Sequence, residues 1–167
     1  LTYGKQYKFP VTIVRYQNIF GPRMGFKHAI PHLVQRFFEG NENPFKIYGS
    51  DQTRAFCYVT DAAEGTVLAM ENENSDQEIF HMGSSNEITI EELTKAVGGL
   101  MGYDGEYVAA PTYPGSVSRR CPDISKSKKF LDYRPKVSWL DGLKKSVTWY
   151  TDFFKSGVEI HSGGFKK

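Results

Sequence analysis

The chain has 167 residues, of which 40% are hydrophobic and 24% charged, and its 21 Lys and Arg against 19 Asp and Glu give a net charge of +2. These values are typical of a globular protein with one substantial core. They argue against a nucleic-acid binder, which needs a basic surface, and against a membrane span, which needs about 18 consecutive apolar residues. Two cysteines, Cys57 and Cys121, indicate a reducing compartment or indifference to redox, so we expect a cytoplasmic location.

Four short segments rich in β-branched or aromatic residues predict β-strands, at residues 11–15, 45–48, 56–59 and 79–82. The first is apolar enough at residues 11–14 to lie in a strand that is buried on both faces. A polar cluster and a Gly-Pro turn follow this strand. Such an arrangement is typical of a binding site at the carboxyl end of a parallel strand.

Helices are predicted between these strands. Apolar residues at helical spacing define one face of a helix, at Ile30, Leu33, Val34 and Phe37. Asp61 followed by Glu64 predicts an N-cap pair that opens a second helix, which ends near residue 70.

Two further helices have stronger start signals. Thr89 and Glu92 form a capping-box pattern, and the buried stripe behind it is expected at Leu93, Ala96, Val97 and Leu100. Ser138 is expected to cap a last helix, whose buried face is formed by Leu143, Val147, Tyr150 and Phe154. Because strands and helices alternate along the chain, the predicted fold class is α/β.

Two patterns suggest sites that their context does not support. Gly99, Gly102 and Gly105 have the spacing of a dinucleotide-binding loop. They follow a helix and precede strand-like residues, the reverse of what such a loop requires, so we interpret them as a helix end and a turn. His28 and His32 have the i, i+4 spacing of metal ligands but no acidic or cysteine partner nearby, so we expect helix-surface residues and no metal site.

Four segments, at residues 15–23, 44–61, 119–129 and 133–144, resemble the extended short-chain dehydrogenase/reductase family of NAD-dependent nucleotide-sugar epimerases and dehydratases. The resemblance runs from about residue 7 to residue 154 and covers only the C-terminal half of that family's fold. It implies the C-terminal part of an NAD-binding Rossmann-type sheet plus a small α/β substrate-binding domain.

The resemblance divides the chain into three parts. Residues 1–25 are expected to form a residual Rossmann strand and site loop, and residues 26–155 the nucleotide-sugar-binding region with returning Rossmann elements. Residues 156–167 are expected to be a frayed tail.

Candidate site residues come from the first three matching segments. The Asn18 amide at a strand end suits a diphosphate or a sugar hydroxyl, and the planar guanidinium of Arg54 can hold phosphate oxygens bidentately. The pair Arg119-Arg120 is expected to add positive charge to the same anion. By resemblance, Asn18, Arg54 and Arg120 contact the substrate diphosphate.

The resemblance also implies a base pocket at Ile47 and Tyr48, with backbone groups reading the pyrimidine, and contacts of Gln17 and Arg23 with NAD. Simpler roles remain open for several of these residues. Asn18 could cap a turn, Tyr48 could pack within its strand, and Arg54 could form a surface ion pair.

Asp123 has two possible roles. It could cap the helix that begins near Ile124, or it could contact a ribose, and we favour the cap.

In the resembling family, a Tyr-x-x-x-Lys pair performs the proton transfer, and NAD bound mostly by the N-terminal half oxidises the sugar to a 4-keto intermediate. None of the ten tyrosines of this chain has a lysine four residues later. We therefore expect no catalytic residue here and no oxidoreductase activity from these residues alone. An alternative interpretation is a non-catalytic module that binds a nucleotide sugar or docks a partner, and a less favoured one is an unrelated α/β domain.

The substrate expected by resemblance is a nucleotide-diphosphate sugar, with a UDP-sugar favoured. Ala55 favours the UDP-glucose 4-epimerase and UDP-glucuronate decarboxylase branches, because the 4,6-dehydratase branch more often carries an acidic residue there. The parent protein is expected to be a homodimer. Neither a nucleic acid nor a membrane is expected as a partner.

Overall fold

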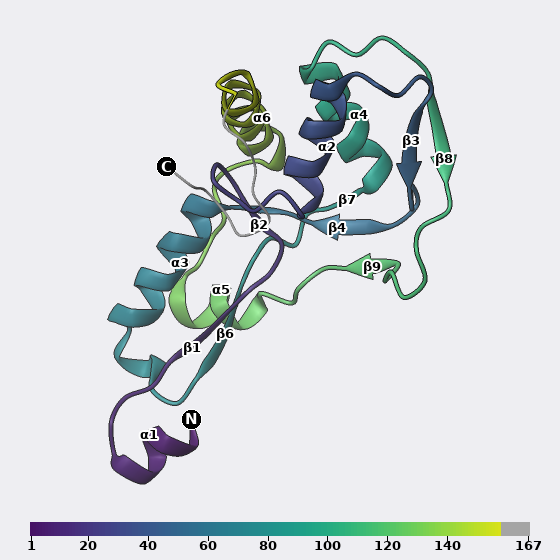
Figure 1. Ribbon diagram of the computed structural model, residues 1–167. Helices are drawn as coiled ribbons and strands as arrows, with labels where there is room; N and C mark the ends of the chain where they lie inside the picture. The colour runs from purple at the N-terminus through teal and green to yellow at the C-terminus, as the bar shows by residue number, and fades with distance from the viewer. Residues whose placement is uncertain (158–167) are drawn as a thin grey trace. The chain divides into compact units, whose positions relative to one another are not determined.

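The computed structural model describes residues 1–157, in which short strands alternate with helices (Figure 1). The α/β class is therefore confirmed. Within residues 1–157, no helix is both long enough and apolar enough to cross a membrane. The chain divides into two compact units, each assembled from three separate stretches of sequence.

Unit 1 comprises Leu1–Ile19, Thr53–Ile88 and Arg119–Trp139. Its helices are α1 (Thr2–Tyr7), α3 (Val59–Glu71), the short 3-10 helix η1 (Glu73–Ser75) and α5 (Ser125–Leu131). Its strands are β1 (Ile13–Tyr16), β4 (Thr53–Ala55), β5 (Cys57–Tyr58), β6 (Ile79–Met82) and β9 (Arg119–Arg120), with most of β7 (Glu87–Thr89). Strand β2 (Ile19–Phe20) lies where the chain leaves this unit.

Strand β1 pairs in parallel with β6, and α3 packs beside both strands (Figure 1). The strand expected at residues 11–15 starts two residues later than predicted, because the backbone N–H of Val11 and the hydroxyl of Thr12 bond to Asp76 and Ser75 instead. Residues 11–14 are half-buried in unit 1, and their expected burial on both faces, which depends on neighbours from the half of the fold that this chain does not cover, stays a prediction. In unit 1, β1 has a paired strand along one edge only.

The core of unit 1 lies between β6, α3 and α5. Its members are fully or almost fully buried apolar side chains, at Ala69, Phe80, Met82, Ile124, Leu131 and Tyr133. The Tyr133 hydroxyl donates to the Gly83 carbonyl oxygen at 3.1 Å and lies 3.4 Å from Cys57 Sγ. Burial raises the pKa of the Cys57 thiol to about 11, so this cysteine stays protonated and unreactive at neutral pH.

Unit 2 comprises Phe20–Gln52, Thr89–Ser118 and residues 140–157 of the described chain. It contains α2 (Ala29–Glu39), α4 (Ile90–Leu100), most of α6 (Trp139–Lys155), and the parallel strands β3 (Phe45–Tyr48) and β8 (Tyr107–Ala110). Aromatic rings fill much of its interior. Phe37 stacks on Phe45 with ring centroids 3.8 Å apart, and Phe26 packs against Tyr150 and Phe153.

The strands predicted at residues 45–48 and 79–82 are confirmed to the residue. The strand predicted at 56–59 is wrong at both ends, because β5 covers only Cys57 and Tyr58 and α3 already begins at Val59. The N-cap role of Asp61 is also wrong. Asp61 lies inside the first turn of α3, and its buried carboxylate accepts a hydrogen bond from the Val137 backbone N–H at 3.0 Å.

The capping box of Thr89 and Glu92 is confirmed, with both reciprocal hydrogen bonds formed. Of the stripe expected behind it, Leu93 and Val97 are fully buried, whereas Leu100 is exposed at the helix end. The glycine run is confirmed as a helix end and a turn, since α4 ends at Leu100 and Gly102 has a φ of 74°.

The last helix, α6, begins directly after Ser138 and ends at Lys155. The tail predicted from residue 156 falls largely on residues 158–167, which lie outside the described residues. The division at residues 1–25 and 26–155 stays a prediction.

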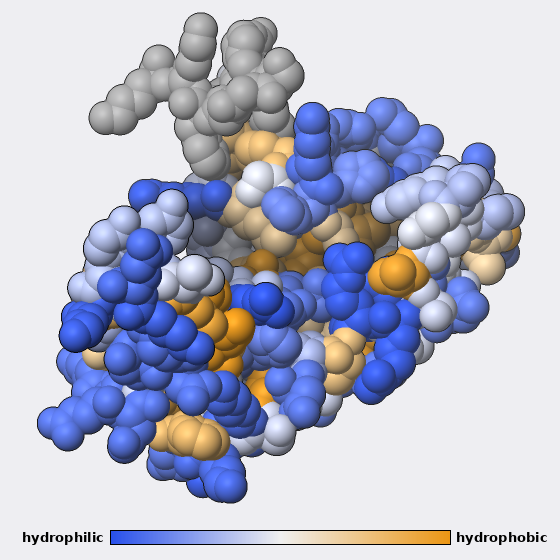
Figure 2. All heavy atoms as spheres, turned by 90° about the horizontal axis from the view of Figure 1, so that it is seen from below, coloured by the Kyte–Doolittle hydropathy of each residue, from blue (hydrophilic) through white to orange (hydrophobic). Residues whose placement is uncertain are grey.

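The face of the molecule seen in Figure 2 is mostly hydrophilic, with separate apolar patches. In unit 1, exposed apolar side chains occur on the outer side of α3, at Val59, Val67 and Met70. The α1 residues Tyr3 and Tyr7 are also exposed and stack on each other. Unit 1 therefore combines a fully buried core with some apolar side chains exposed on these two helices.

Candidate functional site

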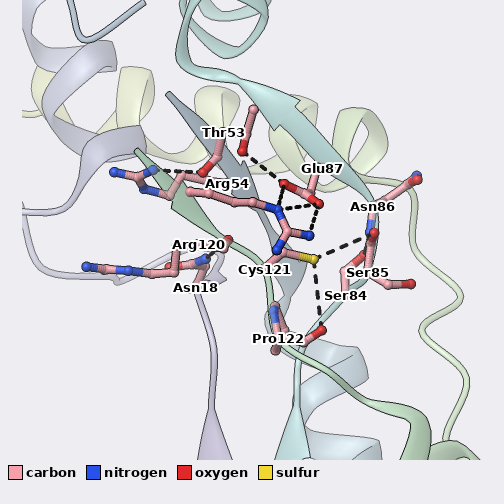
Figure 3. A network of polar contacts seen from close by, with 11 residues as sticks. Asn18, Thr53, Arg54, Ser84, Ser85, Asn86, Glu87, Arg120, Cys121 and Pro122 are labelled. Carbon is pink, nitrogen blue, oxygen red and sulfur yellow. Dashed lines mark hydrogen bonds and ion pairs between the residues drawn. The ribbon is translucent and has the colours of Figure 1, made fainter. Parts of the chain in front are cut away.

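Two arginines meet on one face of the small sheet of unit 1. Strands β4 and β9 are parallel, with Thr53 opposite Arg119 and Arg54 opposite Arg120. Because successive side chains of a strand point to opposite faces, Arg54 and Arg120 share one face and Arg119 lies on the other. Figure 3 shows the Arg54 and Arg120 side chains extending in the same direction.

The two guanidinium groups differ in their surroundings. Arg54 is half-buried, and its Nη1 donates to the Thr53 carbonyl oxygen at 2.7 Å. Arg120 is exposed, and no carboxylate in residues 1–157 forms an ion pair with it. Side chains directly opposite each other on neighbouring strands have Cβ atoms about 5 Å apart. Two positively charged side chains that extend from neighbouring positions repel each other and favour an anion that can accept hydrogen bonds from both.

Asn18 ties together the strands that carry these arginines. Its Nδ2 donates to the Ala55 carbonyl oxygen at 3.0 Å and, more weakly, to that of Arg120 at 3.4 Å. The Asn18 carbonyl oxygen accepts from the Cys57 backbone N–H, and the residue has a left-handed φ of 46°, which Asn tolerates better than most residues. In this geometry both amide protons of the side chain are used in hydrogen bonds within the protein, and only the Oδ1 acceptor remains for a ligand.

On the opposite face of the sheet, Arg119 is bound to Glu87. Arg119 Nη2 lies 2.5 Å from Glu87 Oε1, and Arg119 Nε lies 3.0 Å from Oε2. Thr53 Oγ1 donates to the same Oε2 at 2.9 Å. Hydrogen bonds from Arg119 and then Thr53 hold the pKa of the Glu87 carboxyl below its usual range. Of the arginine pair expected to face one anion, only Arg120 therefore lies on the face of Arg54.

A surface hollow of about 410 Å³ lies beside Arg120. The residues that line it all belong to unit 1: Gln17, His81, Arg119, Arg120, Cys121, Pro122 and Asp123. Gln17 follows β1, and its backbone N–H donates to the Met82 carbonyl oxygen at 2.9 Å. The hollow thus brings the predicted cofactor residue Gln17 and the predicted diphosphate residue Arg120 to one place.

Asp123 lies at the rim of the same hollow. Its Oδ1 accepts from the Ser125 backbone N–H at 2.8 Å, at the start of α5. The N-cap of α5 is Ile124, so the expected N-cap position of Asp123 is wrong by one residue, although Asp123 bonds the first backbone N–H of the helix from the position before the cap. Hydrogen bonds from Ser125 also lower the pKa of the Asp123 carboxyl.

The residues expected to form a base pocket lie in unit 2, on β3. Ile47 is 3% exposed and Tyr48 is 48% exposed, because alternate residues of this strand face the core. The Ile47 side chain therefore packs in the core, and only its backbone could contact a ligand. The guanidinium carbon of Arg36 lies 5.4 Å from the centre of the Tyr48 ring, and Glu42 holds that guanidinium in a bidentate ion pair.

Arg23, the other predicted cofactor residue, also lies in unit 2. It is exposed and has a left-handed φ of 66°, an uncommon conformation for a residue with a long side chain. The loop around it is held by Tyr150 of α6. The buried Tyr150 hydroxyl lies 2.8 Å from the Met24 carbonyl oxygen and 3.2 Å from that of Gly21.

Replacing Tyr150 by phenylalanine is expected to lower the free energy of unfolding by about 1–3 kcal/mol, because the loop carbonyls lose a buried donor. Urea denaturation monitored by circular dichroism measures this change. Tyr113→Phe is the matched control, since Tyr113 is 75% exposed. Equal stability of the Tyr150 and Tyr113 variants would show that the hydroxyl does not hold the loop.

His28 and His32 are both exposed at the start of α2, as expected of helix-surface residues. Across residues 1–157, no group of three or more His, Cys, Asp or Glu side chains could hold a metal ion.

Sequence reasoning missed Glu87 and Thr53. Thr53 lies in the matching segment at residues 44–61 but was given no role there, and Glu87 lies in none of the four segments. The Glu87 carboxylate bonds both Thr53 and Arg119, and so joins three segments that are far apart in the chain. The predicted residues Gln17, Asn18, Arg54 and Arg120 lie together in unit 1, whereas Arg23, Ile47 and Tyr48 belong to unit 2.

Comparison with known proteins gives a consistent result. Residues 1–83 match the model of the NAD dependent epimerase/dehydratase family. The chain is 36% identical over 153 residues to UDP-N-acetyl-alpha-D-glucosaminuronate decarboxylase from Bacillus cytotoxicus, an alignment that covers 86% of this chain and 47% of that protein.

Two solved structures share the fold. The UDP-glucose 4-epimerase of Thermotoga maritima with UDP-glucose superposes with a TM-score of 0.82 at 30% identity, covering 92% of this chain and 50% of that one. The UDP-glucuronic acid 4-epimerase of Bacillus cereus, in complex with UDP-glucuronic acid and NAD, gives a TM-score of 0.81 at 29% identity, covering 91% and 48%. The chain therefore spans about half the length of the relatives it matches.

Proposed function

This chain belongs to the NAD-dependent epimerase/dehydratase family, and we propose that it is the substrate-binding half of a nucleotide-sugar epimerase, dehydratase or decarboxylase that acts through a 4-keto sugar. The substrate class we propose is a UDP-sugar. The observation that carries this proposal is the pair Arg54 and Arg120, two guanidinium groups on one face of neighbouring strands.

A diphosphate suits this pair because it carries several negatively charged oxygens, which can accept hydrogen bonds from two guanidinium groups at once. Asn18 bonds the backbone of Ala55, next to Arg54, and that of Arg120, so we assign it mainly to keeping the two arginines in place. Its predicted direct contact with the diphosphate stays part of the proposal and requires Nδ2 to exchange one of these two bonds for a phosphate oxygen, because Oδ1 is itself an acceptor.

The base of the nucleotide would contact Tyr48, whose ring is half-exposed and supported on one side by Arg36. Ile47 would contribute through its backbone, because its side chain is buried. Aromatic stacking and backbone hydrogen bonds together would favour a pyrimidine.

The cofactor proposed for the parent enzyme is NAD. Within residues 1–157, no glycine-rich turn joins a strand to a following helix, so this chain fits only a minor part of a dinucleotide site. Gln17, beside the hollow next to Arg120, and the exposed Arg23 are the contacts we propose. NAD, when bound, supplies a reversible acceptor for the hydride of the sugar. The residues of this chain would hold the diphosphate and thereby fix where the sugar lies.

These residues alone are expected to bind substrate without turning it over, because no Tyr-x-x-x-Lys pair is present among the ten tyrosines. The same observation favours a second candidate function, a non-catalytic module that binds a nucleotide sugar or docks a partner chain. A homodimeric parent protein and a cytoplasmic location belong to the proposal as well.

Titration with UDP, monitored by NMR chemical shifts, tests the binding function. We expect saturable shifts in β4 and β9, and much weaker binding of uridine, because uridine lacks the diphosphate. Incubation with NAD and UDP-glucose or UDP-glucuronate should yield no product. Steady NAD-dependent conversion by these 167 residues would contradict the proposed division of labour, and failure to bind UDP would contradict the proposed function itself.

A further inference from the structure

Three hydrogen-bonded side chains cross the three-stranded sheet of unit 1, whose strand order is β7-β4-β9. Glu87 lies on one edge strand, Thr53 on the central strand and Arg119 on the other edge strand. One carboxylate bonds both partners, with Thr53 Oγ1 at 2.9 Å and the Arg119 guanidinium at 2.5–3.2 Å. These contacts join the two edges of the sheet across its centre (Figure 3).

Apart from these contacts and the weak 3.4 Å bond from Asn18 Nδ2 to the Arg120 carbonyl oxygen, strand β9 has little to hold its register. It is two residues long, and its pairing with β4 covers only Thr53↔Arg119 and Arg54↔Arg120. Such a short ladder is marginal by itself. A slip by one residue would exchange the faces of Arg119 and Arg120 and remove Arg120 from the face of Arg54.

We propose that Glu87, Thr53 and Arg119 form a clasp that positions Arg120 beside Arg54, and so sets the affinity of this site for a diphosphate. The inference rests on the proposed function. It assigns to Glu87 and Arg119 a positioning role, since both lie on the face opposite Arg54 and Arg120.

Charge gives the clasp a second effect. Arg119 satisfies the Glu87 carboxylate on its own face, so this carboxylate does not neutralise Arg54 or Arg120. The ligand face therefore presents two positive charges, and Glu87 fixes the strand that carries one of them. A glutamine at position 87 keeps the shape of the side chain but lacks the charge and one acceptor oxygen.

The test compares UDP affinity of the full 167-residue chain by NMR titration for wild type, Glu87→Gln, Arg119→Gln and the double variant. We expect each single variant to raise the Kd for UDP about five- to tenfold, and the double variant to raise it no further, because both substitutions break one unit. Arg119→Lys keeps the ion pair and should remain within about threefold of wild type.

Glu91→Gln is the matched control, because Glu91 forms an exposed ion pair of 2.6 Å with Lys95 on α4 in unit 2. Its Kd should equal that of wild type. Chemical shifts of β1 and β6 check that every variant keeps the fold of unit 1.

The outcomes separate the clasp from the proposed function. The clasp alone would be overturned if Glu87→Gln and Arg119→Gln bound UDP as tightly as wild type. It would also be overturned if their losses of UDP affinity added in the double variant. Wild-type chain that binds no UDP would overturn the proposed function and, with it, the role of the clasp. A loss in Arg119→Lys as large as in Arg119→Gln would show that the ion pair itself does not position the strand.

Discussion

Alanine in place of Arg54 or Arg120 is expected to weaken binding of UDP by this chain about 10- to 100-fold, which follows from about 1.5–3 kcal/mol for a hydrogen bond to a charged group. Each substitution removes one of the two guanidinium groups that share a face of β4 and β9. Arg54→Lys should fall between alanine and wild type, because lysine keeps the charge but loses the planar, bidentate geometry. Kd values from NMR titration or calorimetry measure the effect.

Arg134→Ala provides the matched control. Arg134 is also exposed in unit 1, but its ion pair with Asp132 lies away from β4 and β9 in the sequence, next to α5. Its removal should leave the Kd for UDP unchanged. If all three alanine variants bound UDP as tightly as wild type, the two arginines would not form the anion site. If all three lost affinity by the same factor, the loss would point to general charge attraction.

A further comparison separates binding from folding. Arg54 also donates to the Thr53 carbonyl oxygen, so Arg54→Ala could loosen β4 as well as remove a ligand contact. Because the contacts of Arg120 with Asn18 and with β4 are made through its backbone, its side chain can be removed with less effect on the strand. Equal losses of UDP affinity at both positions would therefore favour direct contact over a local folding defect.

Local patterns in the sequence predicted local structure well. The capping box of Thr89 and Glu92 and the strand at residues 45–48 depend on residues close in the chain, and the structure confirms both. Asp61 fails for the opposite reason. Its carboxylate is taken by the Val137 backbone, a partner distant in sequence that no cap pattern reveals.

The candidate site follows the same division. Resemblance marked Arg54 and Arg120 separately, but their register on parallel strands became visible only in the structure. The burial of Ile47 and exposure of Tyr48 follow from the two-residue period of a strand, and this could have been read from the alternation around them. No such period links Glu87 to Arg119, because their contact depends on how three strands are ordered.

Valine in place of Gly65 is expected to lower the free energy of unfolding by about 3 kcal/mol, the upper part of the range for overpacked cores. A Cβ at Gly65 would lie 2.5 Å from Met82 Sδ and 2.8–2.9 Å from the Tyr133 ring. The matched control is Gly99→Val in α4, where nothing lies within 4 Å of an added Cβ. Urea denaturation compares the two variants with wild type.

The size of this effect depends on whether the neighbours of Gly65 can move. Met82 is flexible, but it is fully buried in the core of unit 1. Tyr133 is less able to move, because its hydroxyl is held by the Gly83 carbonyl oxygen and lies against Cys57 Sγ. Valine is a slightly better helix former than glycine, by a few tenths of a kcal/mol, so Gly99→Val should be neutral or weakly stabilising. If Gly65→Val matched Gly99→Val in stability, helix α3 would have to lie farther from β6 and Tyr133 than the structure places it.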